Sequence, residues 1–263
     1  MTTLAKTKEK STPPPKNITS HKIHCGKKTF AQHSLEGHRL SKFSEYSTDQ
    51  MQEHLSNFLI ESWSQSALLT FMRHEKQFER AYIFKDRPAE TSASAIVGRC
   101  YHHVLMEFFT EYQASKRVMN YDELMIIGHN EFASYEESDY KPQVNKTFEQ
   151  VEKDALKHLN TLIQNFLTEF SSYEDDIEEI LFIETRIEEF VVIGNVDIPL
   201  PLKGIPDLVY ISKEGNLRIA DHKSKRSYTS EKDIIMKYYT QSLLYALLLE
   251  SRLKKMPEIL EAY

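Results

Sequence analysis

Two aspartates and a lysine, Asp207, Asp221 and Lys223, are the residues whose types and spacing best suit chemistry. Two carboxylates that face each other need a proton or a cation between them. Oxygen ligands suit Mg²⁺ or Mn²⁺, and a lysine beside such an ion can orient or deprotonate a water or stabilise charge on a phosphate. These three residues therefore indicate metal-assisted hydrolysis of a phosphodiester.

A β-hairpin is predicted to bring the two aspartates together. The apolar segments 205–211 and 217–220 flank the turn 213–215, which ends in glycine and is typical of a three-residue hairpin loop. Counting outward from this loop places Asp207 opposite Asp221, with Lys223 on the same face. The other residues expected on that face are apolar: Ile205, Val209, Ile211, Leu217 and Ile219. An ordinary surface hairpin would also explain any one of these features, but less readily their coincidence.

Two motifs in this region resemble those of a known family. Pro206-Asp207 followed by Asp221-His222-Lys223 resembles the motif of the PD-(D/E)XK nuclease superfamily, and Gln241-Ser-Leu-Leu-Tyr245 resembles the Gln-x-x-x-Tyr motif of its RecB-type branch. The resemblance implies that Asp207, Asp221 and the backbone carbonyl of His222 bind the metal and that Lys223 positions the attacking water. It also implies that Gln241 and Tyr245 orient the lysine or the DNA.

The resemblance extends to a histidine and a glutamate earlier in the chain. Gly98-x-x-x-His102 is similar to the way RecB-type nucleases present an additional metal-binding histidine on a helix, and His103 is the alternative ligand. Glu184 lies on a predicted strand before Asp207, where some relatives place a glutamate near the active site. An exposed, charged strand face explains the alternation of Glu184, Arg186 and Glu188 equally well.

An iron–sulfur cluster is not expected. Ser64, Ser66 and Leu68 resemble the opening of RecB-type domains, but His74-Glu75 stands where relatives have a Cys-Pro pair. Relatives with a cluster need four cysteines, whereas this chain has two.

The chain has 263 residues and a net charge of −6, which suits one sizeable domain with extensions. It has no apolar run of membrane-spanning length and no apolar signal core, so no membrane association and an intracellular (cytoplasmic) location are expected. Residues 1–45 include a proline-rich stretch and scattered histidines, and we expect a disordered or flexible arm there. The nuclease domain is expected over 46–263, with its final strand in doubt because little sequence follows the last helix.

Periodicity predicts the helices that surround the hairpin. The expected segments are 48–60, 67–82, a helix from about 95, 121–136, 147–173 and 231–253. The segment 147–173 has one broad apolar stripe, so we expect it to serve packing. Lys225 and Arg226 follow the candidate lysine closely, and basic residues beside a metal site suit contacts with phosphates.

Together these features predict an α/β fold with a restriction-endonuclease-like core, a small mixed β-sheet flanked by helices. The predicted activity is that of a Mg²⁺- or Mn²⁺-dependent DNA nuclease, exonuclease-like on ends or single strands, in repair, recombination or phage DNA processing. A helicase or recombination protein is a candidate partner chain. The alternatives are a catalytically inactive nucleic-acid-binding module of the same fold, and an unrelated hydrolase or structural protein that carries this hairpin.

Overall fold

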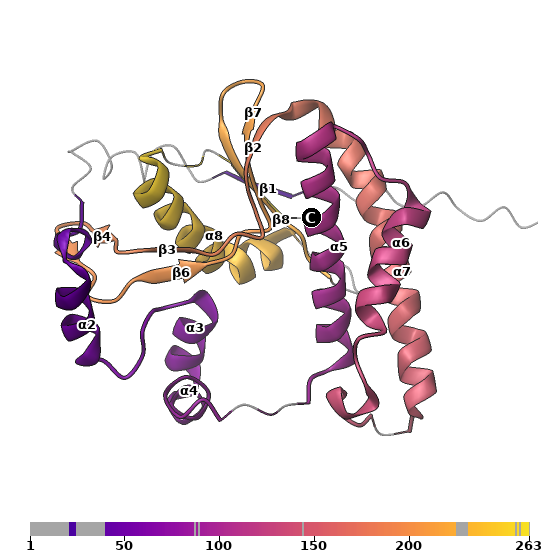
Figure 1. The fold of residues 1–263 in the computed structure, drawn as a ribbon, viewed down its shortest axis with the longest axis horizontal. Helices are drawn as coiled ribbons and strands as arrows, with labels where there is room; N and C mark the ends of the chain where they lie inside the picture. Colours follow the sequence, from indigo (N-terminus) through magenta and orange to yellow (C-terminus); the bar gives the residue numbers. More distant parts are fainter. Residues whose placement is uncertain are drawn as a thin grey trace, which may run out of the picture.

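The computed structural model describes residues 21–24, 40–86, 88, 90–143, 145–224, 231–255, 257 and 259–262. Its main sheet contains β1 (His21–His24), β2 (Ile177–Ile183), β7 (Leu208–Ser212), β8 (Leu217–Asp221) and β9 (Ile259–Ala262). The strand order is β1-β9-β8-β7-β2, in which β8 and β9 are parallel and the other neighbours are antiparallel. The predicted mixed sheet is therefore confirmed, and helices lie on both of its sides (Figure 1).

The β7–β8 hairpin has the predicted register. Ile211 pairs with Leu217, and Ser212 N–H donates to the carbonyl of Asn216 at 2.9 Å. Gly215 has a φ of +80°, the left-handed conformation that the loop requires. Continued outward, this register places Asp207 and Asp221 at the same end of the hairpin, one just before β7 and the other at the end of β8.

One face of the sheet packs against three helices. These are α5 (Ala93–Ser115), α6 (Tyr121–Phe132) and α7 (Phe148–Tyr173). Their buried side chains form the larger core together with Leu208, Tyr210 and Ala220 of the sheet. The apolar stripe predicted for α7 is part of this core: Val151, Ala155, Leu159, Leu162, Ile163, Phe166 and Phe170.

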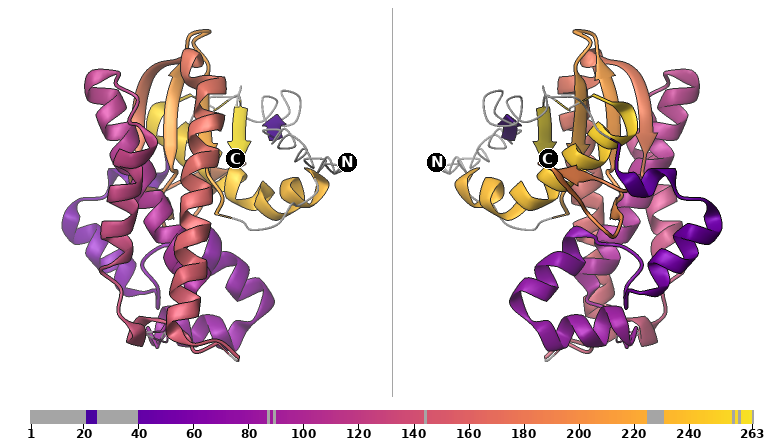
Figure 2. Two further views of the ribbon diagram at one scale, coloured as in Figure 1. Left: turned by 90° about the vertical axis from the view of Figure 1, so that its right-hand side faces the viewer. Right: turned by 90° about the vertical axis from the view of Figure 1, so that its left-hand side faces the viewer.

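The opposite face packs against α8 (Glu231–Leu253), as Figure 2 shows. Val209, Leu217 and Ile219 meet Leu244 and Leu248 in a smaller core. Successive residues of a strand point to opposite faces, so odd-numbered residues of β7 and β8 face α8 and even-numbered ones face α5 and α7. Ile205, which we expected on the apolar face, is exposed instead because it precedes the strand.

Short strands connect β2 to β7. β3 (Ile187–Glu189) pairs with β6 (Leu202–Gly204), and β4 (Val192–Ile193) pairs with β5 (Val196–Asp197). The strand that we predicted around residues 180–190 is therefore interrupted. It breaks at Glu184, whose φ of +41° is incompatible with an extended strand.

The amino-terminal helices are shorter than predicted. They are η1 (Lys42–Glu45), α2 (Thr48–Ser56), α3 (Gln65–Arg73), α4 (Glu75–Phe78) and the π-helical turn η2 (Glu79–Ile83). The single helix predicted over 67–82 breaks at His74, whose backbone is not helical. Short 3-10 turns also occur at η3 (Glu137–Asp139) and η4 (Glu174–Asp176).

The ends of the described chain contribute two strands to the main sheet. Within the segment 1–45, β1 pairs with β9, and Phe43 is buried against Phe190 and His54. A final strand does follow α8, since β9 lies parallel to β8 and covers its edge. Among the described helices, none combines the length and the apolar character that crossing a membrane would require.

Candidate active site

The site lies where β7 begins and β8 ends, between α5 and α8. Asp207, Asp221 and His222 are all buried there. One carboxylate oxygen of Asp207, Oδ2, accepts the backbone N–H of His222 at 2.5 Å and lies 3.6 Å from Nδ1 of the same residue. The hairpin thus fixes the position of Asp207 through the chain that follows Asp221.

Three side chains from separate elements converge on one side of this point. Nδ1 of His102, on α5, lies 2.8 Å from Oε1 of Glu184 and 3.3 Å from Oδ1 of Asp207. One ligand atom from each of these residues lies within 4.8 Å of the others. Among the described residues, this is the group of histidine, cysteine, aspartate or glutamate side chains that could hold a metal ion.

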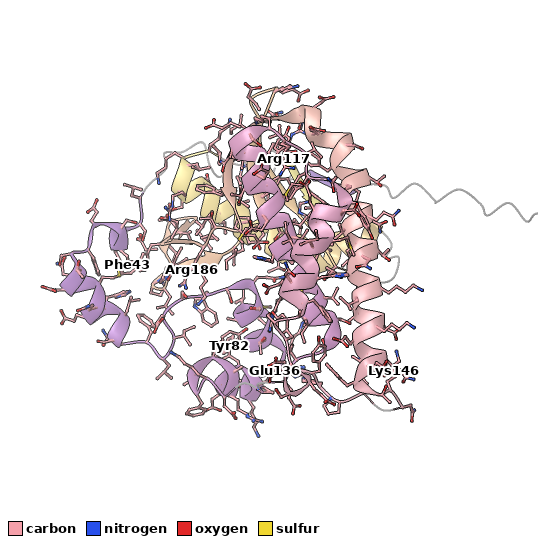
Figure 3. All side chains as sticks on the ribbon, turned by 45° about the vertical axis from the view of Figure 1, so that its right-hand side comes forward. Phe43, Tyr82, Arg117, Glu136, Lys146 and Arg186 are labelled. Carbon is pink, nitrogen blue, oxygen red and sulfur yellow. The ribbon has the colours of Figure 1, made fainter. Side chains whose placement is uncertain are left out.

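The interruption of the strand at Glu184 directs the Glu184 carboxylate toward the site. The Glu184 N–H donates to the carbonyl of Asp207 at 2.9 Å, which ties the end of β2 to the start of β7. Arg186 and Glu188 pair with each other at the surface, near the label of Arg186 in Figure 3. The expected alternation of all three residues on one strand face is therefore wrong, but Glu184 does lie beside Asp207.

Electrostatics in this group favour a cation. Burial disfavours the charged form of His102, but hydrogen bonds and charges from Asp207 and Glu184 outweigh it and raise its pKa to about 10. Burial likewise favours a neutral Asp207, yet His102 and His222 hold the pKa of its carboxyl well below the ordinary value. In the described part of the chain, no lysine or arginine forms an ion pair with Asp207 or Glu184.

A hydrogen-bonded chain occupies the other side of the site. Lys223 forms an ion pair with Asp221, and its ammonium donates to Oε1 of Gln241 at 3.1 Å. The amide of Gln241 donates to the hydroxyl of Tyr245 at 2.9 Å, and that hydroxyl donates to the carbonyl of Ile205 at 2.8 Å. The two α8 side chains therefore connect the lysine to the segment immediately before Asp207.

The pKa of Asp221 is shifted in the opposite direction from that of Asp207. Burial, together with the charge of Asp207, raises the pKa of Asp221 to about 6, although Lys223 partly counteracts this. Burial also raises the pKa of Tyr245 well above its ordinary value, so its hydroxyl stays protonated and acts as a donor. Gln241 adds only a distant contact to Asp221, at 3.5 Å.

Two glycines allow the helices to approach the site. A Cβ on Gly98 of α5 would lie 3.0 Å from Oγ of Ser224, just after the lysine. A Cβ on Gly204 would lie 2.7 Å from a ring carbon of Tyr245. The distance at Gly204 is closer than real Cβ contacts, so a side chain there would displace Tyr245, whereas at Gly98 the contact is tight and the Ser224 side chain would have to shift slightly.

Sequence reasoning missed Glu169 on α7, which we had assigned to packing alone. Burial raises the pKa of Glu169, and the charge of His222 opposes the rise, so the two side chains interact. The His222 ring lies against Phe109 and Phe166, at 5.8 and 5.7 Å between ring centroids. The sequence could have revealed Glu169, because it is an acidic residue on the apolar stripe of this helix, next to Phe170.

The remaining predicted residues divide into three groups. His103 points elsewhere, with Nε2 4.0 Å from Glu131, and it does not belong to the three-residue group that contains His102. Asp221 is not in the three-residue group, and its carboxylate forms an ion pair with Lys223. Lys225 and Arg226 lie outside the described residues.

The donor set fits a hard divalent cation. Two carboxylates and one imidazole suit Mg²⁺ or Mn²⁺. Structural zinc sites usually contain cysteine, and this group contains none. The carboxylates of Asp207 and Glu184 are drawn together around one histidine. A bound cation would replace the proton of that histidine as the positive partner.

Comparison with known proteins gives one clear match. A family model described as the PD-(D/E)XK nuclease superfamily matches residues 62–262. No curated protein matches the chain. The matched range begins just before α3, ends with β9, and contains every residue of the site described above.

Proposed function

The chain belongs to the PD-(D/E)XK nuclease superfamily, and we propose that it is a Mg²⁺- or Mn²⁺-dependent DNA nuclease acting on single strands or DNA ends. Family membership makes it a restriction-endonuclease-like α/β protein, a nuclease and a user of divalent metals. The observation that carries the proposal is the convergence of His102, Glu184 and Asp207 beside the Asp221–Lys223 pair.

In this proposal the residues have separate tasks. His102, Glu184 and Asp207 would hold the cation, and the family resemblance adds Asp221 and the His222 carbonyl as further ligands. The chemistry that a divalent cation supplies when bound is polarisation of the scissile phosphate and acidification of the attacking water.

Lys223 would act on the same water or on the phosphate. Its ammonium is held by Asp221 and Gln241, which fixes the direction in which the lysine side chain points. A fixed positive charge near the reacting phosphate stabilises negative charge that builds up in the transition state. Tyr245 anchors Gln241 and thus maintains that direction.

The link between Gln241 and Lys223 supports the RecB-type branch, because the motif predicted that these side chains would meet. An exonuclease-like mode of action follows from that resemblance. A role in repair, recombination or phage DNA processing, inside the cell and beside a helicase or recombination protein, belongs to the same proposal. Phosphate contacts by Lys225 and Arg226 also remain part of it.

A cleavage assay tests the proposal. Purified protein would meet linear duplex, circular duplex and single-stranded DNA with Mg²⁺, Mn²⁺ or EDTA, next to Lys223→Ala. Metal-dependent loss of linear or single-stranded DNA, but not of circular duplex, is expected and should disappear in the variant. Nicking of circles would instead make the protein an endonuclease.

The outcome that contradicts the proposal is the absence of cleavage with metal bound normally. The protein would then be an inactive nucleic-acid-binding module of the same fold. Titration with Mn²⁺ provides the second measurement, and we expect Asp221→Asn to weaken binding. A chain that binds no Mn²⁺ would remove the metal centre from the proposal.

A further inference from the structure

Four aromatic rings form a cluster on α3, α4 and the segments beside them. Trp63 stacks on Phe78 with 5.5 Å between centroids and 20° between planes, and Phe78 stacks on Tyr82 at 5.2 Å and 22°. Phe71 packs edge-on against both Trp63 and Phe78. We refer to Trp63, Phe71, Phe78 and Tyr82 as the aromatic shelf; Tyr82 is labelled in Figure 3.

The shelf and its sequence neighbours expose an unusual amount of apolar surface. Phe71 is 45% exposed, Met72 71% and Phe84 67%. Exposed large apolar side chains in one region mark an interaction site more often than scattered ones do. The π-helical turn η2 lies within this segment, between α4 and Phe84, and such turns occur frequently at functional sites.

The backbone connects the shelf directly to the candidate active site. The Trp63 N–H donates to the carbonyl of Pro201 at 2.8 Å, and the Lys203 N–H donates to the carbonyl of Trp63 at 2.7 Å. Trp63 is therefore paired with β6, and Asp207 follows four residues after Lys203. Four extended residues span at most about 14 Å. In Figure 1, α3 and α4 lie beneath β6, on the side toward α5.

We propose that the aromatic shelf stacks unpaired bases of a single-stranded DNA whose backbone enters the candidate active site. Parallel rings provide flat faces on which successive bases can continue the stack, and stacking of this kind tolerates any base sequence. Paired bases in a duplex have their faces covered by their neighbours, so the shelf selects single strands. The inference rests on the proposed nuclease function and assigns it a substrate class.

Local charge agrees with a nucleic-acid strand. Between Trp63 and Asp86 the sequence contains four lysines or arginines and three acidic residues, although the whole chain carries −6. Arg73 and Lys76 lie exposed beside the shelf, where they can meet phosphates. Arg80 is already paired with Asp86 and is not available in the same way.

Trp63 is the single tryptophan of the chain, so its fluorescence reports on the shelf without labelling. The experiment titrates the full-length protein with oligo-dT of graded length in EDTA, where cleavage cannot occur, and records both tryptophan quenching and anisotropy of a labelled strand. We expect quenching by single strands and none by duplex of equal length. Saturated binding without quenching would overturn the proposal.

Exposed residues provide the variants, because truncating them leaves the core intact. Phe71→Ala combined with Phe84→Ala should weaken oligo-dT binding by about tenfold to a hundredfold. Leu59→Ala combined with Ile126→Ala removes exposed apolar side chains outside the shelf and serves as the matched control, with unchanged binding. Equal affinity for both double variants would contradict the proposal.

The design separates this inference from the proposed function. Quenching and length-dependent binding without any cleavage in Mg²⁺ or Mn²⁺ would overturn the nuclease and leave the shelf as a binding site. Cleavage by the Phe71→Ala, Phe84→Ala variant at the wild-type rate, with unchanged binding, would overturn the shelf alone. Self-association of the wild-type chain that the Phe71→Ala, Phe84→Ala variant abolishes would assign the surface to a second copy of the protein instead.

Discussion

The two sides of the candidate site are built on different principles. The metal side consists of His102 on α5, Glu184 just after β2 and Asp207 just before β7. Two of these three residues are acids. On the lysine side, Asp221 and Lys223 are neighbours in sequence, and Gln241 connects them to α8. The metal side gathers two acids around a histidine that is positive only while it is protonated, whereas the lysine side pairs an acid with a lysine.

This difference indicates which side depends on the metal ion. Like charges brought together in a buried place repel each other unless a cation lies among them. The lysine side already contains its own cation and a hydrogen bond from Lys223 through Gln241 and Tyr245 to the backbone. We therefore expect variants of the metal side to act first on metal binding, and variants of Lys223, Gln241 and Tyr245 to act on turnover with the metal still bound.

The largest effect is expected for Asp207→Ala, because it removes the carboxylate that contacts both His102 and His222 and that belongs to the three-residue group. Cleavage should fall by at least about 1,000-fold, since metal-ion catalysis contributes several kcal/mol to the barrier. Mn²⁺ binding, followed by calorimetry, should weaken in parallel. Loss of cleavage with full Mn²⁺ affinity would show that Asp207 is not a ligand.

The second-largest effect is expected for Lys223→Met. It keeps the length of the side chain but removes the charge, so cleavage should decrease by roughly 100- to 1,000-fold. Mn²⁺ affinity should stay close to the wild-type value, and that pair of measurements is what distinguishes the two sides of the site. If Mn²⁺ affinity fell as far as in Asp207→Ala, the two sides would be one unit.

Glu184→Gln should lower Mn²⁺ affinity by about 10- to 100-fold. Losses of metal affinity in this range are typical when a residue that supports a metal site is substituted. Glu188→Gln is the matched control, since Glu188 lies on the same stretch but pairs with Arg186 at the surface. Its Mn²⁺ affinity and cleavage rate should not change. An equal effect of both substitutions would favour a general change of surface charge.

The smallest effect is expected for Tyr245→Phe, which removes one hydroxyl and its hydrogen bonds to Gln241 and Ile205. Unfolding free energy should decrease by about 1 kcal/mol, and cleavage by several-fold through a less well-held Lys223. Denaturant titration measures the first and single-turnover kinetics the second. Tyr239→Phe, on the exposed side of the same helix, should alter neither.

The sequence predicted the lysine side better than the metal side, for a physical reason. A three-residue loop ending in glycine determines the pairing on both sides of it, so the positions of Asp207 and Asp221 follow by counting. The meeting of Gln241 with Lys223 was anticipated from a motif. Both features depend on local spacing or on short patterns.

The metal side depends on contacts between distant segments. Glu184 reaches His102 because its backbone turns at a positive φ and bonds to Asp207, which no strand periodicity reveals. The helical period could not distinguish His102 from His103. Strand β9 is four residues long and was missed for the same reason, since its place is decided by β8 beside it.

The wide separation in sequence of the site's contributors has a consequence for synthesis. Residues from His102 to Tyr245 must all be present before both sides of the site can assemble, and β9 follows later still in the chain. Contacts between such distant segments form late in folding. While the chain is being translated it therefore lacks the complete site, so the proposed nuclease activity would require that almost all of these residues have emerged from the ribosome.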